Sequence, residues 1–331
     1  MMTWSREMRS TLDRSTGLRS LHILCVAAGV LALTFFAGAG AQEKTVPAST
    51  AAQKTFATAR EAAEALVSAS ESFDAPAMTA ILGPDGEDLV VTGEPVKDRD
   101  AATAFAAKAR EKLAVDTDPK NPNRAILSVG NQDWPLPIPI LRKNGTWRFD
   151  SKAGRQEILY RRIGANELDA IQICRGYVEA QHEYALVERD GSGVNQYAQR
   201  IISTPGKQDG LAWRNADGTW EGPVGEDIAR IIELGYTDKA TPYHGYFFKV
   251  LKGQGKAAPM GEMDFVVKGV MIGGFALMAV PAEYLVTGVK TFIVSHDGAV
   301  YEKDLGDGTL NALKTMERYN PDKTWKRVLE E

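Results

Sequence analysis

The sequence predicts an α+β protein in which a small N-terminal domain of helices plus a meander precedes a long helix packed on an antiparallel sheet. Three observations support this fold class: Ala-rich segments with apolar residues at helical spacing lie between residues 53 and 115, the longest helical pattern covers 166–188, and alternating β-formers flank the Asn144-Gly145 and Asp297-Gly298 turns. Hydrophobic residues make up 44% of the chain and charged residues 25%, as in globular proteins that bury a core.

The first 41 residues have the three parts of a secretory signal peptide. Four arginines precede an apolar run over 21–36, and Ala39, Gly40 and Ala41 then form a small-residue cleavage site before Gln42. The run is short for a membrane span, although a retained anchor is the alternative interpretation. We therefore expect a periplasmic or secreted protein with no stable membrane span after cleavage, in which 42–52 is a flexible linker.

The charge of the chain excludes one broad class of partner. Cleavage after Ala41 removes four arginines and two acidic residues, which changes the formal net charge from -4 to -6. Such a chain has no general attraction for nucleic acid, so the expected partner is an envelope protein or a small molecule. Cys174 is the one cysteine that remains, and we expect it to be buried in a helix rather than reactive.

The N-terminal domain is predicted to cover 53–150. A helix is expected over 55–72, a second short helix begins at Asp74 as its N-cap, and a third covers 98–115. A strand over 124–130 and a hairpin around Asn144-Gly145 complete it.

The C-terminal domain is predicted to cover 151–310 and to begin with helical sequence. Asn166 is the expected N-cap of the long helix, and a short helix is expected over 225–234. Strands are expected over 211–214, 245–252, 265–267, 274–281, 290–295 and 298–303. The remaining residues, 311–331, are rich in charge and are expected to form a terminal helix or a loose tail.

Five spaced segments of the chain form a recognisable set. They are "GPDGED" at 83–88, "NGTWRFD" at 144–150, "AQHEYA" at 180–185, "YHGYFFKVLKGQG" at 243–255 and "TGVKTFIVSHDGAVYEKDLG" at 287–306. Together they resemble a bacterial secreted family of unknown function, DUF2950. The resemblance covers roughly residues 53–310 and implies no particular activity.

Two further resemblances concern architecture alone. The last hairpin of the predicted sheet has a characteristic pattern at Gly288, Lys290, Thr291, Phe292, Val294, Asp297, Gly298 and Val300. A long helix followed by a sheet with this hairpin is similar to the head of type IV pilins and pseudopilins, although the helix here is amphipathic and follows a folded domain. The N-terminal domain looks similar to the nuclear-transport-factor-2-like fold.

One pair of residues is a candidate for catalysis or metal binding. Glu179 and His182 lie three positions apart, so they share a face of the predicted helix. A hydrolase of unrecognised type could use them, whereas a solvated surface pair is the simpler interpretation. The motifs of serine hydrolases, P-loop proteins and zinc proteases are absent from the sequence.

The Gly-rich segment after the long helix partly matches a calcium-binding loop. Glu188, Asp190, Ser192 and Gln196 occupy the first, third, fifth and ninth positions, and Gly193 occupies the sixth. The twelfth position lacks the bidentate glutamate, so calcium would bind weakly. The alternative is a Gly-rich helix stop, and no other cofactor is expected.

Aromatic residues give the remaining candidate site. Trp213, Trp220, Tyr243, Tyr246 and Phe248 are close in sequence, and those at the surface would line a groove beside the 253–262 loop. Burial in the core is the alternative. The sequence thus leaves three hypotheses: a non-catalytic binding or envelope-assembly module, a secreted hydrolase, and a structural calcium-binding module.

Overall fold

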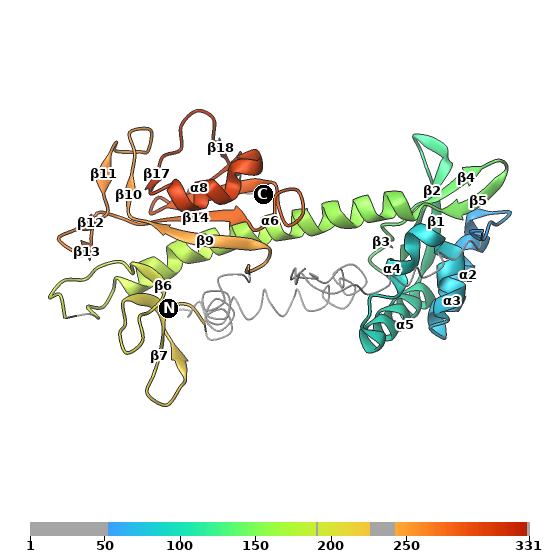
Figure 1. Ribbon diagram of the computed structural model, residues 1–331, viewed down its shortest axis with the longest axis horizontal. Coiled ribbons are helices and arrows are strands. Elements are labelled where there is room, and N and C mark those ends of the chain that lie inside the picture. The colour runs from blue at the N-terminus through green and yellow to red at the C-terminus, as the bar shows by residue number, and fades with distance from the viewer. Residues whose placement is uncertain (1–51, 190, 226–241, 330–331) are drawn as a thin grey trace, which may run out of the picture. The chain divides into compact units, whose positions relative to one another are not determined.

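The computed structural model describes residues 52–189, 191–225 and 242–329. The predicted signal peptide with Ala39, Ala41 and Gln42, nearly all of the linker, Asp190 and nearly all of the expected 225–234 helix lie outside these residues. The chain divides into two compact units between Arg161 and Arg162. The structure contains helices and antiparallel sheets, which confirms the α+β class (Figure 1).

The N-terminal unit combines helices with a small antiparallel sheet. In this sheet β1, β2, β4 and β5 are neighbours in that order, and β3 pairs with β2. The elements are α2 (Ala59–Glu71), α3 (Ala75–Leu82), η2 (Pro84–Gly86), α4 (Glu87–Val90), α5 (Pro95–Glu111), β1 (Leu113–Asp118), β2 (Asn121–Val129), β3 (Trp134–Pro135), β4 (Ile140–Lys143) and β5 (Thr146–Phe149).

Local sequence signals explain the turns and helix ends of this unit. Asp74 is the N-cap of α3, and its Oδ1 accepts a hydrogen bond from the Ala77 N–H at 3.0 Å, as predicted. Asn144 and Gly145 both have positive φ, 52° and 82°, which a tight turn between β4 and β5 requires. The helix expected over 98–115 ends earlier, at Glu111, because the chain enters β1 at Leu113.

Helix α6 (Ser151–Tyr184) is one continuous helix that passes the boundary between the two units. The prediction that Asn166 begins a new helix is wrong. Asn166 lies inside α6, and its Nδ2 donates a hydrogen bond to the Thr287 carbonyl at 2.8 Å. Gly164 lowers helix stability by about 1 kcal/mol relative to alanine, which is too little to end a helix without a proline nearby.

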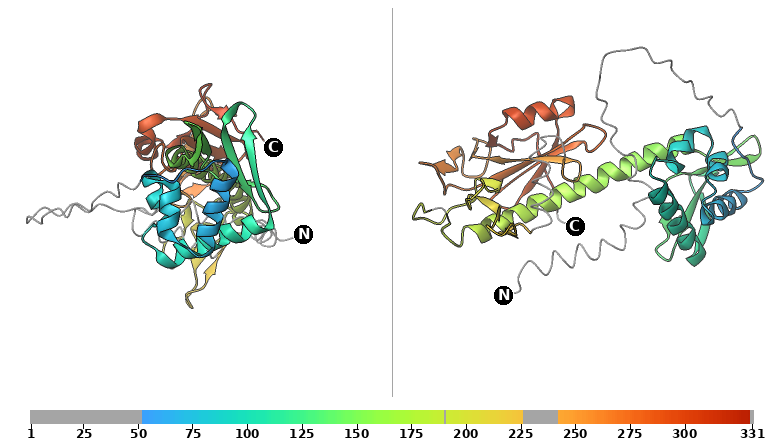
Figure 2. Two further views of the ribbon diagram at one scale, coloured as in Figure 1. Left: turned by 90° about the vertical axis from the view of Figure 1, so that its right-hand side faces the viewer. Right: turned by 60° about the horizontal axis from the view of Figure 1, so that its bottom comes forward.

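The C-terminal unit is built on a five-stranded sheet in the order β18-β16-β15-β14-β9. Helix α6 lies against one face of this sheet and α8 against the other (Figures 1 and 2). Every residue of β14 is consequently buried, as expected for a strand covered on both faces. The strands of this unit are β6 (Arg200–Ile202), β7 (Gly210–Arg214), β8 (Trp220–Glu221), β9 (Tyr246–Leu251), β10 (Gly253–Gln254), β11 (Met263–Asp264), β12 (Val266–Val267), β13 (Val270–Met271), β14 (Ala276–Pro281), β15 (Lys290–Ser295), β16 (Val300–Asp304), β17 (Arg318–Tyr319) and β18 (Lys326–Arg327); η3 (Gly306–Gly308) and α8 (Thr309–Thr315) are its other described elements.

The Asp297-Gly298 hairpin joins β15 to β16 as the sequence predicts. Gly298 has a φ of 75°, and Asp297 accepts a hydrogen bond from the Ala299 N–H at 3.0 Å. The charged tail expected over 311–331 is instead part of the folded unit. It supplies α8, β17 and β18, and both Tyr319 and Trp325 are buried in the core.

Candidate functional site

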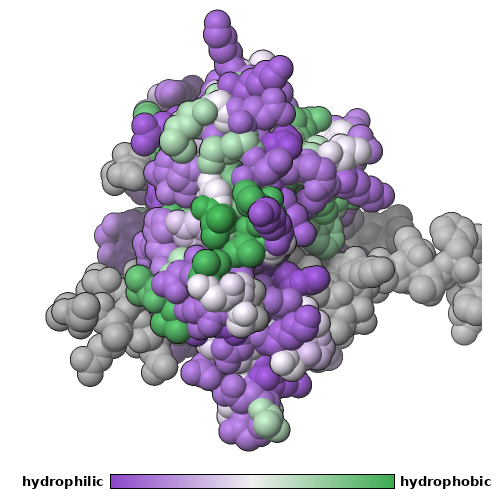
Figure 3. Space-filling view, turned by 90° about the vertical axis from the view of Figure 1, so that its left-hand side faces the viewer, coloured by the Kyte–Doolittle hydropathy of each residue, from purple (hydrophilic) through white to green (hydrophobic). Residues whose placement is uncertain are grey.

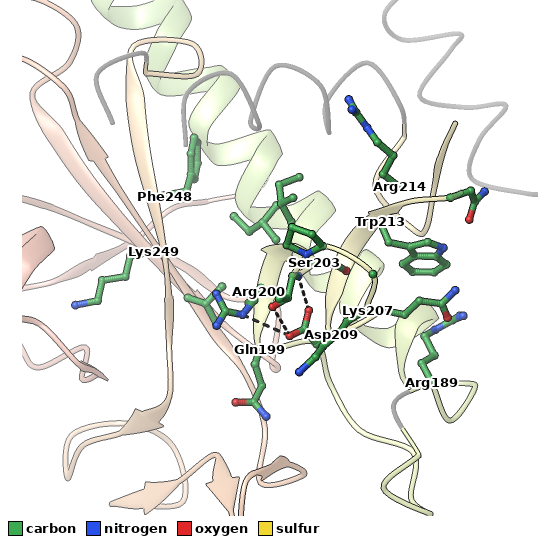
Figure 4. Close-up of a pocket in the computed structure, with 18 of the residues that line it drawn as sticks. Arg189, Gln199, Arg200, Ser203, Lys207, Asp209, Trp213, Arg214, Phe248 and Lys249 are labelled. Carbon is green, nitrogen blue, oxygen red and sulfur yellow. Dashed lines mark hydrogen bonds and ion pairs between the residues drawn. The ribbon is translucent and has the colours of Figure 1, made fainter. Parts of the chain in front are cut away.

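A large open groove lies in the C-terminal unit beside strands β6, β7 and β9. Its volume is about 1640 Å³, which exceeds the ~300–1000 Å³ of ordinary small-molecule pockets. Figure 4 shows Trp213 and Arg189 on one side of the groove, with Phe248 and Lys249 of β9 on the other. The site can therefore hold an extended ligand rather than a small compact one.

The loop that borders the groove, residues 203–209, is shaped by its own turn residues. Pro205 and Gly206 occupy the central positions of a turn, in which Gly206 has a φ of 76° and the Lys207 N–H donates to the Thr204 carbonyl at 2.9 Å. Asp209 closes the loop by accepting hydrogen bonds from the Thr204 N–H at 2.7 Å and from the Thr204 hydroxyl at 2.8 Å. This arrangement holds Lys207 at an exposed position on the groove rim.

The groove carries an excess of positive charge. Among its described lining residues Asp209 is the only acid, and that carboxylate is engaged by Thr204 and lies 3.6 Å from Arg200. Groups of one sign in a concave surface reinforce one another and attract ligands of opposite charge. The basic lining residues are Arg189, Arg200, Lys207, Arg214, Lys249 and Lys252.

Stacking on aromatic rings orients the arginine at one end of the groove. The Arg189 guanidinium lies 5.2 Å from the centre of the Tyr184 ring and 5.0 Å from that of Trp213. Its Nε also donates to the Tyr184 carbonyl at 3.4 Å, and the Tyr184 hydroxyl donates to the Gln208 carbonyl. A guanidinium fixed in this way can bind a carboxylate through two parallel N–H groups with little further loss of entropy.

The lysines of the groove differ in what they contact. Lys249 forms an ion pair with Glu317 at 2.6 Å. Within the described part of the chain, Lys207 and Lys252 form no ion pair, and both are exposed. These two exposed ammonium groups are therefore available to an incoming anion.

The structure brings two of the five predicted aromatic residues into this groove. Trp213 and Phe248 line it, although only 5% of the Trp213 surface is exposed. Trp220 is half-buried beside Arg214, whose guanidinium lies 5.1 Å from the indole centre, and it does not line the groove. Tyr243 is also half-buried, with its ring 4.3 Å from that of His244 and 6.5 Å from that of Phe248.

Of the two alternatives for Tyr246, a binding surface and the core, the structure shows the core. Its side chain is fully buried, and its hydroxyl donates to the Lys290 carbonyl at 2.9 Å. Burial raises the pKa of this phenol far above its usual value. Alternation along β9 alone could not show that helix α6 covers the face on which Tyr246 lies.

The candidate catalytic residues His182 and Glu179 are exposed on the surface of α6, and neither lines the groove. The His182 ring packs 5.5 Å from that of Phe275 and 6.4 Å from that of Tyr197. No described hydrogen bond or ion pair joins His182 to Glu179.

A different histidine has a carboxylate partner. His244 Nδ1 lies 2.5 Å from Asp169 Oδ2, and both side chains are partly exposed. His244 has a φ of 47° and precedes Gly245 with a φ of 73°, so the two form the tight turn that leads into β9. No local sequence pattern indicates this pair, because the two residues come from α6 and from the loop before β9.

The predicted calcium loop lies only partly within the described residues, because Asp190 is outside them. Gln196 is buried; its Oε1 accepts from the Met271 N–H at 3.0 Å, and its Nε2 donates to Ser192 Oγ at 3.4 Å. Glu188 is exposed. The described residues contain no group of three or more His, Cys, Asp or Glu side chains arranged for a metal ion. The calcium site stays a prediction.

Cys174 is buried in the core between α6 and the sheet, as expected. Burial raises the pKa of its thiol to about 12, so the thiolate is not formed at neutral pH.

Another surface of the C-terminal unit carries exposed apolar side chains. The face shown in Figure 3 is mostly hydrophilic, with a small group of hydrophobic side chains near its centre. Large exposed apolar residues of this unit include Leu186, Val187, Val194, Val267 and Ile272. No contact in the described structure covers them, and they lie outside the groove.

The fold and the site together define an α+β protein with a basic, partly apolar groove in its C-terminal unit. Comparison with models of known families matches residues 53–328 to the family described as "Protein of unknown function (DUF2950)". The chain belongs to this family, and the match confirms the resemblance seen in the sequence. No curated protein and no solved structure matches the chain. The pilin-like and nuclear-transport-factor-2-like resemblances therefore remain predictions.

The described residues contain no helix that is long and apolar enough to cross a membrane.

Proposed function

We propose that this protein is an exported, non-catalytic binding module whose ligand occupies the groove of the C-terminal unit. The observation that carries the proposal is the lining of the groove. It combines cations on three separate segments with apolar side chains, and its described lining residues include no histidine and no cysteine. Such a surface supports recognition of an anionic ligand better than acid–base or nucleophilic chemistry.

Export is part of this proposal. The arginine-rich start, the apolar run over 21–36 and the cleavage sequence that ends at Ala41 support a periplasmic or secreted location. We expect the mature protein to begin at Gln42, and N-terminal sequencing of the protein recovered from the envelope or the medium would test this.

Site-specific photo-cross-linking in the native host tests the binding function. A photoreactive amino acid replaces Lys207 on the groove rim in one strain and Lys323 in a control strain. Lys323 is also exposed, but it lies outside the groove. We expect discrete cross-linked products for the Lys207 position and none of the same mass for the Lys323 position.

Two results would contradict the proposal. One is identical cross-linking, or none, at both positions. The other is turnover of an envelope substrate by the purified protein that is lost in His182→Ala, Glu179→Ala or His244→Ala, since a binding module needs none of these side chains for chemistry.

A further inference from the structure

We infer that the groove binds a peptide segment of a partner protein in which acidic and apolar side chains are interspersed. This inference rests on the proposed function and adds the chemical class of the ligand.

The positive charge of the groove favours an anionic ligand. The exposed cations Lys207 and Lys252 form no ion pair in the described structure, and the guanidinium of Arg189 is oriented by two aromatic rings. These groups come from three segments that border the same cavity, so the ligand must carry several negative charges along its length. A carboxylate can bind a planar guanidinium through two parallel N–H groups, and it can also pair with a single ammonium group.

The neutral polar side chains of the groove are largely used by the protein itself. The Thr204 hydroxyl donates to Asp209 at 2.8 Å, and Ser203 Oγ accepts from the Gly210 N–H at 2.9 Å. Gln199 Nε2 donates to the Gly269 carbonyl at 2.7 Å. Recognition of a sugar chain needs many neutral partners for its hydroxyl groups, and this groove offers few that are uncommitted.

The aromatic rings of the groove do not offer a platform for sugars either. Trp213 is only 5% exposed, and Arg189 covers one face of its indole. A neutral or acidic polysaccharide would therefore lose the stacking contacts on which such ligands depend.

Apolar side chains between the cations distinguish a peptide from other polyanions. Ile202, Val250 and Leu313 line the groove and are half-buried at the edge of the core. A ligand that carries apolar side chains can cover these surfaces and remove them from water, whereas polyphosphate or a polyuronate cannot. The size of the groove, about 1640 Å³, also fits an extended chain.

Fluorescence anisotropy with the full protein and defined probes tests the inference. The main probe is a short fluorescein-labelled peptide that repeats Glu, Leu, Glu and Ser. One control peptide carries Gln in place of Glu, and another carries Ser in place of Leu. Polygalacturonate and polyphosphate are added as competitors, and each titration is repeated at two salt concentrations.

The expected result is saturable binding of the main probe that weakens at higher salt, as screening of exposed charges requires. Both control peptides should bind at least about tenfold more weakly, because each loses several charged or apolar contacts. The double variant Lys207→Gln/Lys252→Gln should weaken binding about threefold to tenfold. Lys323→Gln removes the same charge from an exposed site outside the groove and should leave affinity within about twofold.

The outcomes separate this inference from the function on which it rests. Suppose that the Lys207 position cross-links a specific product in cells but the main probe fails to bind the purified protein. The inferred ligand class is then wrong, whereas the binding function stands. The same conclusion holds if polygalacturonate or polyphosphate displaces the labelled peptide at a lower concentration of negative charge than the unlabelled peptide does. Equal binding of the peptide that carries Ser in place of Leu would also overturn the inference. If the cross-linking experiment fails as well, the binding function itself is wrong.

Discussion

Replacing Gln181 with leucine is expected to destabilise the C-terminal unit, because this buried amide satisfies both polar groups of the Ala198 backbone. Its Oε1 accepts from the Ala198 N–H at 2.8 Å, and its Nε2 donates to the Ala198 carbonyl and to the Tyr177 hydroxyl, both at 2.8 Å. Gln181 is fully buried, so water cannot replace these contacts. The side chain thereby ties helix α6 to the segment that leads into β6 and the groove.

The structure allows the magnitude to be estimated. Leucine has a similar size but leaves the Ala198 N–H and carbonyl without partners. Each buried polar group left unsatisfied costs about 1–3 kcal/mol, and the added apolar burial offsets part of this. We expect the free energy of unfolding to fall by about 2–4 kcal/mol, which lowers Tm by roughly 5–15 °C for a unit of this size.

Differential scanning calorimetry and hydrogen exchange measure the two parts of this prediction. Gln172→Leu is the matched control, since Gln172 lies exposed on the same helix and should change stability by less than about 0.5 kcal/mol. The Ala198 amide should exchange faster in Gln181→Leu than in the control. Equal Tm values and equal exchange at Ala198 for the two variants would refute the argument.

Two other predictions follow from buried positions. Gly288→Ala should destabilise the protein by about 1–3 kcal/mol, because the new Cβ would overlap the Tyr246 hydroxyl. Gly308→Ala is the control and should be tolerated, because open space surrounds Gly308. Urea unfolding compares the two variants, and equal midpoints would contradict the predicted overlap. Cys174 should resist a thiol reagent at pH 8 in the native protein and react in guanidinium. Because its folded pKa is raised to about 12, above an unfolded value near 8.5, its contribution to stability is complete below pH ~8.5 and is lost as pH rises toward 12. The free energy of unfolding of Cys174→Ala should lack this decrease at high pH. If the native protein were labelled at pH 8 as fast as the protein in guanidinium, the thiol would not be buried.

Much of the fold could be predicted from the sequence, because its signals are local. The Asn144-Gly145 and Asp297-Gly298 turns specify their hairpins through residues that accept positive φ. Asp74 as an N-cap and strand β15 were identified in the same way. The family could also be recognised, since its segments are spread over most of the chain.

Features that depend on tertiary contacts could not be predicted. The charged residues after 310 suggested a tail, yet Tyr319 and Trp325 among them are buried against the sheet. Asn166 has the character of an N-cap, but its side chain bonds to Thr287 from within a longer helix.

The candidate site shows the same limit. Trp213 and Phe248 were selected as aromatic residues, and both line the groove. The cations Arg189, Lys207 and Lys252 were not selected, because they are scattered along a chain whose net charge is negative. Only the fold places them around one cavity.

The burial of β14 has a consequence for how the C-terminal unit folds during synthesis. The segment Ala276–Pro281 carries no charge and lies inside the sheet, with β9 on one side and β15 on the other. One of its faces is covered by α8 and the residues around Tyr319, all of which follow β14 in the chain. Until those residues are synthesised, an apolar face of the sheet stays exposed to contact with other chains. A chain that is cut or prematurely terminated near residue 310 should therefore aggregate rather than fold, because the residues after 310 keep this face of the sheet away from other chains.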